Sequence, residues 1–599
     1  MKVADYVVSF LESKGIKNIF MLSGGFCLPM VDAVANSDIK YICNLHEQAA
    51  AIAAEAYAQY TGDPGVCMVT AGPGGTNAIT GVASAWLDSI PMIILSGQVQ
   101  SKDLKGSRKV RQIGFQEIDI VKIVDSITKY SVTVQDPKDI KCVMEGAWYQ
   151  ATTGRQGPVW IDIPLDIQSA QINEHQLRGF SAEQFLPSPG TNKQKTLANK
   201  VSKFYDLIKE SKRPVILAGN GIRSSGAKDK FLSLAEKLGI PVLTTWKSVD
   251  FMSENHPLFV GRPGLIAQRG ANFSQQNSDL FISIGARLDL GQTAFNHDNF
   301  ARKAKKIIVD VDQAEIDKMQ FDVDCEINFD ASDFIDEALK QLDSLENNFS
   351  DWLSICKNWQ EKYPVILEEY WQQEQCVNNY VLIDVLSKLA KPGNLVVPGS
   401  SGACSEVTMQ AFKVKDGIRV FNSEGLGSMG FGIPASIGGC IASNRAETIC
   451  IDGDGGFVMN IQELETVKRL NLPIKYFVLN NGGYVSIRNS QDKHFDKQIA
   501  SGEDSGVTLP DIEKVCKSYG IKYRKLENHN NITENTQEIL AEEGPVICEV
   551  IMLHTHESLP RNSTYKKGDG TFVSLPMEDL LPLLPREEFE ENMRISKND

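Results

Sequence analysis

Two polar residues with oxygen ligands come shortly after apolar runs in the C-terminal third of the chain. Asp454 follows the run Ile449–Ile451, and Asn481 follows the run Tyr476–Leu479. Two parallel strands joined by a helix would bring both residues to the carboxyl edge of one sheet. Carboxylate and amide oxygens are ligands that Mg²⁺ selects, and Mg²⁺ usually completes its octahedron with phosphate oxygens. The spacing therefore predicts a Mg²⁺ site formed by Asp454 and Asn481.

Glycines surround the acidic residue in the segment Gly453-Asp454-Gly455-Gly456. Because glycine has no side chain, backbone N–H groups at these positions can approach a diphosphate closely. The helix expected to follow directs its positive N-terminal end toward the same place. We predict that the segment holds a diphosphate through a divalent metal. The alternative is a generic strand–turn–helix with an incidental aspartate.

The elements that must position this motif occur twice, as a diverged internal repeat. In each half a small-residue helix, an apolar strand, a glycine turn, a helix and a second strand follow one another. In the first half these are residues 48–60, 66–70 and 72–75, a helix opening near Thr76-Asn77, and residues 92–95. In the second half they are residues 434–442, 449–451, 453–456, 462–469 and 474–479. Each strand–turn–helix suits a parallel doubly wound sheet.

A third unit of the same type lies between the halves, with apolar runs at 214–218, 280–284 and 307–310. The sequence therefore predicts an α/β fold with three doubly wound parallel-sheet domains. The predicted ranges are 1–170, 195–345 and 375–555, with a C-terminal arm at 556–599 that packs on the body. Residues 169–195 are predicted to be a linker. Residues 347–375 are predicted to form a connecting helix whose Trp352 and Trp359 dock on a domain.

The segment Gly453-Asp454-Gly455, its spacer and Asn480-Asn481 resemble the metal–diphosphate motif of thiamine diphosphate enzymes. The resemblance implies a pyrimidine-binding domain at the N-terminus and a diphosphate-binding domain at the C-terminus. It also implies that Gly483 completes the metal site. The turn 398–402 resembles, by position, the other side of the diphosphate cradle, although an ordinary turn is the alternative. Its candidate cofactor-binding residues are Gly399, Ser400 and Ser401.

Glu47 stands immediately before the first small-residue helix. Alone, it could be a helix N-terminal acid favoured by the dipole. In the resembled family the matching glutamate binds N1′ of the aminopyrimidine and favours the imino form that removes the C2 proton. Because Glu47 and Asp454 lie in different halves, the cofactor should lie across a domain interface. In this family that interface joins two subunits, which implies a homodimer or a homotetramer.

A closer resemblance, over about residues 1–555, is to the acetohydroxyacid synthase-like branch. The segment 424–434 resembles the loop that grips the aminopyrimidine, where Gly427 offers its carbonyl and Met429 bends the cofactor. Residues 46–48, 72–77 and 114–117 resemble further segments of the branch. These segments imply that Pro73 and Asn77 bind the cofactor and that Phe115 and Gln116 line the substrate channel. Gly25 would border the reacting centre. Gly25 and Gln116 are therefore predicted to be catalytic residues.

Three features depart from that branch. Phe26 stands where the branch usually has alanine, and Arg488 falls near the place of a tryptophan that favours a keto-acid acceptor. Gly219-Asn220-Gly221 and Arg287 resemble flavin-contacting positions, but their surroundings differ, so FAD is left as an open candidate. The run 111–130 with residues 482–488 instead resembles a subgroup of polysaccharide and deoxysugar pathways.

These resemblances imply a thiamine diphosphate- and Mg²⁺-dependent enzyme that decarboxylates a 2-oxo acid, with pyruvate the first candidate, and transfers the aldehyde to a carbonyl acceptor. Arg488, Phe26, Phe115 and Gln116 are the predicted substrate residues. A nucleotide-linked keto sugar is the leading acceptor, because an arginine fork suits phosphate oxygens and sugar hydroxyls. The alternatives are an acetolactate synthase, a simple decarboxylase, and a catalytically silent structural relative.

Composition narrows the range of partners. The chain has 599 residues and a net charge of −15, which gives no electrostatic reason to bind nucleic acid or an anionic membrane. No uninterrupted apolar run is long enough to span a bilayer, and the N-terminus lacks a signal peptide's apolar region. The twelve cysteines form no CxxC pair. We therefore expect reduced thiols in a cytoplasmic protein.

Overall fold

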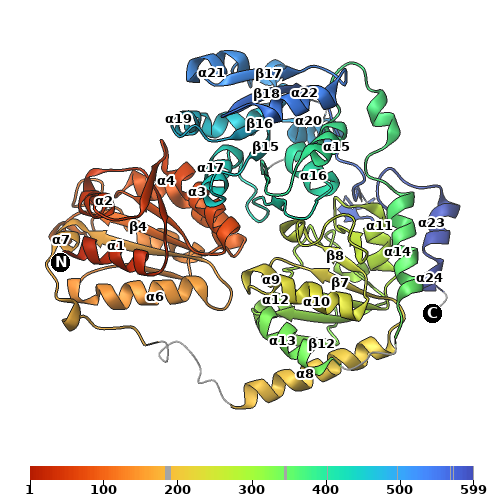
Figure 1. The fold of residues 1–599 in the computed structure, drawn as a ribbon, viewed down its shortest axis with the longest axis horizontal. Coiled ribbons are helices and arrows are strands. Elements are labelled where there is room, and N and C mark those ends of the chain that lie inside the picture. Colours follow the sequence, from red (N-terminus) through yellow and green to blue (C-terminus); the bar gives the residue numbers. More distant parts are fainter. Residues whose placement is uncertain are drawn as a thin grey trace.

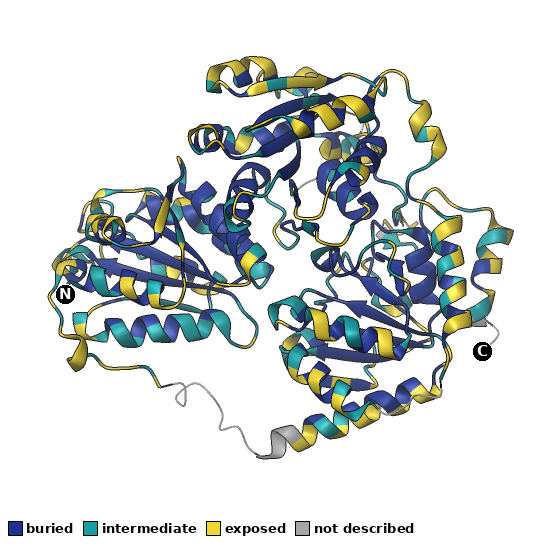
Figure 2. Ribbon diagram, in the orientation of Figure 1, coloured by how far each residue is buried: buried dark blue, intermediate teal, exposed yellow. Residues whose placement is uncertain are grey.

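The computed structural model describes residues 1–181, 191–342, 347–400, 402–495, 497–566, 568–570 and 572–597. Within these residues, three six-stranded sheets and one two-stranded sheet are present. Every strand pairing inside the three large sheets is parallel, and helices cover both faces of each sheet (Figure 1). The predicted fold class is therefore confirmed. Figure 2 shows that the central strands of each sheet are buried, as expected for parallel sheets covered on both faces, whereas edge strands such as β2 and β17 are partly exposed.

The N-terminal domain has the strand order β2-β1-β3-β4-β6-β5. Its strands are β1 (Asn18–Met21), β2 (Lys40–Cys43), β3 (Gly65–Val69), β4 (Met92–Gln98), β5 (Tyr130–Thr133) and β6 (Pro158–Pro164). Its helices are α1 (Val3–Ser13), α2 (Leu28–Ala35), α3 (Glu47–Thr61), α4 (Pro73–Leu87), α5 (Ile120–Val124), α6 (Ile140–Thr152) and α7 (Leu165–Ser169). The small-residue helix α3 is buried along almost its whole length, which its alanines permit.

The C-terminal domain has the order β14-β13-β15-β16-β18-β17. Its strands are β13 (Leu395–Pro398), β14 (Arg419–Val420), β15 (Thr448–Gly453), β16 (Ile474–Asn480), β17 (Lys522–Leu526) and β18 (Val546–Ile551). Its helices are α15 (Asn379–Leu389), α16 (Gly402–Ala411), α17 (Gly432–Ala442), α18 (Asp454–Phe457), α19 (Leu464–Arg469), α20 (Val485–His494), α21 (Ile512–Tyr519) and α22 (Ile532–Ala541), with the 3₁₀ helix η10 (Val458–Glu463) between α18 and α19. Numbered within each domain, the strand order equals that of the N-terminal sheet, as the predicted internal repeat requires.

The central domain has a different order, β12-β11-β10-β7-β8-β9. Its strands are β7 (Pro214–Ala218), β8 (Val242–Thr244), β9 (Phe259–Gly261), β10 (Leu280–Ile284), β11 (Lys305–Asp310) and β12 (Cys325–Asn328). Its helices are α8 (Thr191–Glu210), α9 (Gly221–Ser224), α10 (Lys228–Leu238), α11 (Arg269–Gln276), α12 (Gln313–Asp317) and α13 (Ala331–Gln341). The order turns back between β10 and β7, which places a crevice at the carboxyl ends of those strands.

The N-terminal and C-terminal domains meet through their equivalent helices α3 and α17. A Cβ added at Gly438 of α17 would lie 2.0 Å from the carbonyl oxygen of Ala53 in α3, so the two backbones approach closely. Figure 1 shows α17 beside α3 and α4 at this junction. The close contact fixes the two sheets relative to each other.

Two predicted boundaries are wrong. Helix α4 begins at Pro73 rather than near Thr76-Asn77, because proline is tolerated at the first helical position, where its missing N–H has no partner anyway. The helix predicted at 462–469 begins at Asp454 as α18 and continues through η10 and α19, with non-helical angles at Asn460. The linker predicted at 169–195 lies partly outside the described residues, and its last part is the start of α8.

The connecting segment and the C-terminal arm both pack on the central domain. Helix α14 (Ser350–Lys362) carries Trp352 and Trp359, which are buried against central-domain residues. The arm contains the antiparallel pair β19 (Thr564–Lys566) and β20 (Phe572–Ser574), then α23 (Arg586–Asn592) and α24 (Arg594–Lys597). Asn272 of α11 donates to the carbonyl of Met577, and Trp359 donates to Asn592. The arm therefore covers α11 and α14.

Candidate functional site

The carboxyl edge of β15 and β16 brings Asp454 to the hairpin that follows Asn480. The parallel register pairs Gly453 with Leu479, so the two strands end side by side. Asp454 Oδ2 accepts backbone N–H groups from Asn481 at 3.1 Å, Gly482 at 2.8 Å and Gly483 at 3.0 Å. Burial raises the pKa of Asp454, and these backbone bonds lower it. The Asp454 carboxylate thus lies against the backbone of residues 481–483, which include the other predicted metal ligands.

The chemistry of this cluster fits a divalent cation with a diphosphate. Asp454 and Asn481 are buried and supply hard oxygen ligands. A Cβ added at Gly453 would meet nothing within 4 Å, so this turn faces open space. The buried hydroxyl oxygens of Ser400 and Ser428 have no hydrogen-bond partner among the described residues. Unpartnered buried hydroxyls beside a glycine turn are groups that a bound anion would satisfy.

The remaining predicted diphosphate residues surround the same turn. A Cβ added at Gly455 would lie 3.3 Å from Met429, and one added at Gly427 would lie 3.3 Å from the carbonyl of Ser400. The buried Asp452 packs against Gly399 and Gly456, where an added Cβ would lie within 2.1 and 2.5 Å of its carboxylate. Three loops therefore converge at the end of β15. Ser401, also predicted here, lies outside the described residues.

A second cluster forms at the carboxyl edge of the N-terminal sheet. Glu47, 7% exposed at the start of α3, accepts a hydrogen bond from Asn77 of α4 at 3.0 Å. A Cβ added at Gly74 would lie 3.7 Å from the Glu47 carboxylate, which places the turn around Pro73 beside it. This carboxylate is therefore held against the first turn of α4.

The predicted substrate residues of the N-terminal domain lie around the same edge. Thr70 accepts a hydrogen bond from the backbone N–H of Phe26 at 3.2 Å, next to Gly25, whose missing side chain faces open space. The backbone of Gln116 lies against Gly72, and Gln116 has a positive φ of 62°, a strained value for a residue other than glycine. Phe115 is 78% exposed. Phe26 and Gln116 therefore contact Thr70 and Gly72, at the edge beside Glu47.

Among the described residues, no hydrogen bond joins Glu47 to Asp454 or to the hairpin 481–483. What joins the two domains here is Glu463, at the end of η10. Its carboxylate accepts Asn44 Nδ2 at 3.0 Å and the backbone N–H of Leu45 at 2.8 Å. The segment leading to Glu47 is therefore held by the C-terminal domain of the same chain.

Arg488, a predicted substrate residue, is buried, and carbonyl oxygens surround its guanidinium. It is only 5% exposed. Its guanidinium donates to the carbonyl oxygens of Asn481, Gly482, Ser501 and His554. All five of its N–H groups are engaged by these carbonyls, which leaves none for an acceptor. The predicted contact of Arg488 with a phosphate or a sugar is therefore not supported.

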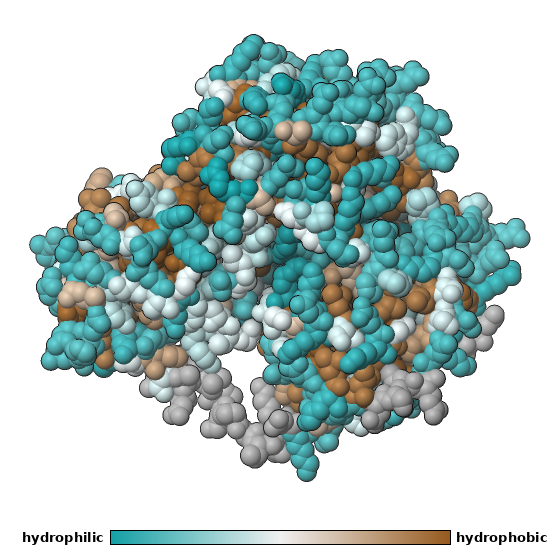
Figure 3. Space-filling model, in the orientation of Figure 1, coloured by the Kyte–Doolittle hydropathy of each residue, from teal (hydrophilic) through white to brown (hydrophobic). Residues whose placement is uncertain are grey.

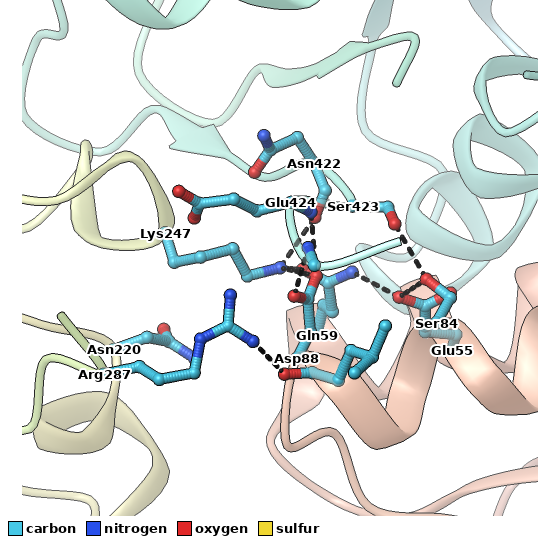
Figure 4. A network of polar contacts seen from close by, with 12 residues as sticks. Glu55, Gln59, Ser84, Asp88, Asn220, Lys247, Arg287, Asn422, Ser423 and Glu424 are labelled. Carbon is cyan, nitrogen blue, oxygen red and sulfur yellow. Dashed lines mark hydrogen bonds and ion pairs between the residues drawn. The ribbon is translucent and has the colours of Figure 1, made fainter. Parts of the chain in front are cut away.

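The three domains meet in a buried polar network (Figure 4). Lys247 Nζ donates to Gln59 Oε1 at 2.7 Å, Asp88 Oδ2 at 3.0 Å and the carbonyl of Asn422 at 2.6 Å. One lysine of the central domain thus binds both other domains. Burial raises the pKa of Glu55 and of Glu424, in the same network, to about 8.

Next to this network lies a cavity of about 330 Å³ between the N-terminal and central domains. It opens at the carboxyl ends of β7, β8, β10 and β11, where doubly wound sheets bind nucleotides. Three of the predicted flavin residues line it, namely Asn220, Gly221 and Arg287. Gly219 instead packs against Gly285 and Ala286, where an added Cβ would lie within 2.5 Å of the backbone.

Sequence reasoning missed Glu463, Lys247 and Asp452. The partners of Glu463 lie more than 400 residues away along the chain, so no local spacing marks it. The partners of Lys247 come from two other domains. Asp452 had a local signal, because it is a charged residue directly after the apolar run Ile449–Ile451.

Three family models match the chain. "Thiamine pyrophosphate enzyme, N-terminal TPP binding domain" matches residues 1–123, the central domain of the same family matches 201–338, and its C-terminal TPP binding domain matches 400–550. The chain therefore belongs to the thiamine pyrophosphate enzyme family.

Similar proteins over nearly the whole length are acetolactate synthases. A probable acetolactate synthase large subunit of Methanocaldococcus jannaschii is 35% identical, over 94% of this chain and 93% of its own. The large subunit of Lactococcus lactis is 31% identical, over 93% of both chains. The isozyme 1 large subunit of Escherichia coli is 30% identical, over 91% and 93%. The chain is thus an acetolactate synthase-like enzyme, and these relatives support that alternative better than a keto-sugar acceptor.

In the described part of the chain, no helix has both the length and the apolar character needed to cross a bilayer.

Proposed function

We propose that this enzyme binds thiamine diphosphate and Mg²⁺, decarboxylates a 2-oxo acid and joins the resulting aldehyde unit to a second 2-oxo acid. The observation that carries the proposal is the cluster at the end of β15 and β16. There the buried Asp454 carboxylate and the Asn481 hairpin lie beside two buried hydroxyls that have no partner within the described part of the chain. Oxygen ligands next to unpartnered donors suit a metal with a diphosphate.

The residues divide the work between the two domains. Asp454, Asn481 and the carbonyl of Gly483 would hold Mg²⁺, while Ser400, Ser428 and the glycine turn would hold the diphosphate. Glu47, kept in place by Asn77, would hold a proton at N1′ of the aminopyrimidine. When bound, thiamine diphosphate supplies the carbon nucleophile and the electron sink for decarboxylation. Gly25, Phe26 and Gln116 would border the substrate.

A 2-oxo acid is our proposed acceptor. The relatives are named acetolactate synthases, and the keto-sugar reading depended partly on Arg488, whose donors are already used. A simple decarboxylase would release free aldehyde, and a silent relative would release no CO₂.

We infer that a second copy of the chain completes each site. Glu47 and Asp454 belong to separate clusters in one chain, yet both must reach one cofactor. Large apolar side chains also lie exposed beside both clusters, as is typical of a surface that binds another protein. They are Leu28, Leu45, Phe115, Leu426 and Met459. Figure 3 shows apolar surface gathered over both of these domains on one face. A homodimer, or a pair of such dimers, would bury these side chains.

For the cavity between the N-terminal and central domains we propose a nucleotide cofactor, with FAD as the first candidate. Arg287 and Arg155 line it and could meet a pyrophosphate, while Asp310, at the end of β11, stands where doubly wound sheets place a ribose-binding acid. Denaturing the purified protein and examining the supernatant for a flavin spectrum tests this cofactor. A colourless supernatant from an active enzyme would remove FAD.

We also propose a cytoplasmic location, because most of the twelve cysteines are buried in apolar segments, as reduced structural thiols usually are.

Product analysis tests the reaction. Purified protein with thiamine diphosphate, Mg²⁺ and pyruvate is expected to release CO₂ and form acetolactate. Free acetaldehyde as the main product would favour a decarboxylase. Product formed only when a keto sugar is added would restore the sugar acceptor. An absence of CO₂ with both cofactors present would contradict an active enzyme.

A further inference from the structure

Arg488 lies near the candidate metal site, and hydrogen bonds to carbonyl oxygens engage its whole guanidinium group. It projects from α20, five residues beyond Gly483, and is almost fully buried. Its Nη2 donates to the carbonyl of Asn481 at 2.7 Å and lies 3.3 Å from Asn481 Oδ1, a predicted metal ligand. Its Nη1 donates to the carbonyl of Gly482 at 3.1 Å. Three hydrogen bonds therefore reach the hairpin that meets Asp454.

The other side of the same guanidinium binds two distant segments. Nη1 donates to the carbonyl of Ser501 at 2.9 Å. Nε and Nη2 both donate to the carbonyl of His554, at 3.1 and 2.8 Å. A planar fork with five fixed donors can hold several carbonyls in one geometry, which a lysine ammonium cannot. Arg488 thus joins the hairpin to Ser501 and to the start of the C-terminal arm.

The backbone around the guanidinium is built to admit it. A Cβ added at Gly483 or at Gly502 would lie 3.0 Å from Arg488 Nη1. These two glycines form an isolated antiparallel bridge with each other. Gly483 has a φ of +132°, which residues with side chains rarely adopt. The hairpin conformation and the arginine position are therefore matched to each other.

We propose that Arg488 is a positioning residue for the Mg²⁺ site, and that it fixes the hairpin 481–483 against Asp454 before the metal binds. The inference rests on the proposed function for the identity of the metal. In the loaded enzyme, Asp454 and Asn481 would hold the ion, and Arg488 would hold Asn481.

Charge alone predicts the opposite effect, and this makes the role testable. A buried cation this close to a metal site repels Mg²⁺. If Arg488 acted only through its charge, removing it would strengthen Mg²⁺ binding. If it acts by holding the hairpin, removing it weakens Mg²⁺ binding, because the ligands are no longer held together. Loss of a residue that orients a metal ligand typically costs roughly 10–100-fold in metal affinity.

The experiment titrates Mg²⁺ by calorimetry into the full-length, metal-free protein with excess thiamine diphosphate. Arg488→Met is expected to weaken Mg²⁺ binding by roughly 10–100-fold. Arg488→Lys keeps the charge but loses the fork, and is expected to recover only part of that affinity. The matched control is Arg269→Met. Arg269 is equally buried and donates to the carbonyls of Leu580 and Pro582, far along the arm. It should lower thermal stability without changing Mg²⁺ affinity.

Two outcomes overturn the proposal, namely unchanged or tighter Mg²⁺ binding by Arg488→Met. Asp454→Ala separates this failure from failure of the proposed function. If Asp454→Ala also binds Mg²⁺ normally, the metal site itself is misplaced. If Arg488→Met does not fold, hydrogen exchange of the metal-free Arg488→Lys protein tests the positioning role instead. Faster exchange at residues 481–483 than in wild type is expected, and equal exchange would contradict the role.

Discussion

The Glu47 carboxyl is buried beside the N-terminal turn of α4, where Asn77 fixes one of its oxygens. A carboxyl held in this way suits proton transfer at a fixed atom of a ligand. We predict that Glu47→Gln leaves the fold and much of the cofactor binding intact, because the amide has the same shape. Exchange of the thiamine C2 proton should slow by roughly 10²–10⁴-fold, the usual contribution of a positioned acid or base.

Proton NMR of quenched samples measures that exchange, with Mg²⁺-dependent cofactor binding as the folding control. Wild-type exchange rates in the variant would contradict the assignment of Glu47.

For single residues, the sequence predicts well only those neighbours in space that local spacing along the chain indicates. Asp454 and Asn481 could be paired in advance, because each follows an apolar run and parallel strands end at one edge. Arg488 could not be assigned, because Ser501 and His554 lie 13 and 66 residues away and only the folded chain brings them to it. An exposed loop arginine and this buried one look alike in the sequence.

Helix α3 packs closely against two neighbouring helices, α17 and α4. Gly438 of α17 faces the backbone of Ala53, and Gly81 of α4 faces Ala51. We predict that Gly438→Ala destabilises the protein by roughly 1–3 kcal/mol, because backbone cannot move aside as a side chain can. Helix propensity alone would favour the alanine by about 1 kcal/mol.

Gly146→Ala in α6 is the matched control for this substitution. There an added Cβ would lie 3.2 Å from the ring of Phe180, a side chain that can shift. Denaturant unfolding of both variants checks the prediction. Equal stabilities would mean that the α3–α17 contact is looser than the structure describes.

Element types were predictable because buried parallel strands leave short apolar runs bounded by glycine and proline. The residues at which elements begin and end were harder to predict. Pro73 begins a helix and does not precede one, and the helix after Asp454 starts at the motif itself. Both starts are set by caps and close packing, which apolar periodicity does not record.

The junction of the three domains makes the whole molecule sensitive to pH. Burial raises the pKa of Glu55 from 4.5 to about 8, and Asp88 adds to the rise. The folded protein therefore keeps a proton that the unfolded chain releases. This contribution to stability is fully present below pH 4.5 and is lost as the pH rises through about 8. Glu55→Gln mimics the protonated acid, so its melting temperature should rise relative to wild type as the pH increases.

Melting curves of both proteins at several pH values between 4.5 and about 8 measure this difference. Glu374→Gln, at an exposed site, serves as the control and should follow wild type throughout. Parallel curves for Glu55→Gln and wild type would show that Glu55 is ionised in the folded protein.

The proposed dimer predicts complementation between inactive variants. Glu47→Gln and Asp454→Ala should each be inactive alone. If each site takes Glu47 from one copy and Asp454 from the other, a mixed dimer holds one intact site and one doubly defective site. Random mixing of equal amounts should restore roughly a quarter of the wild-type sites.

The subunits are exchanged by mild denaturation and refolding before turnover of pyruvate is measured. No recovery from dimers shown to be mixed would mean that each chain builds its own site.

The equal strand order of the first and third sheets has a historical consequence. It is what duplication and fusion of one ancestral gene would leave, and the α3–α17 contact is then the relic of a former twofold axis between identical proteins. The cofactor has two unlike ends, so the copies could not stay alike. In the proposed function, one copy supplies Asp454 and Asn481 for a metal, and the other supplies Glu47 for a heterocycle. Each copy thereby became indispensable to the other, and neither can be lost from the lineage without losing the reaction.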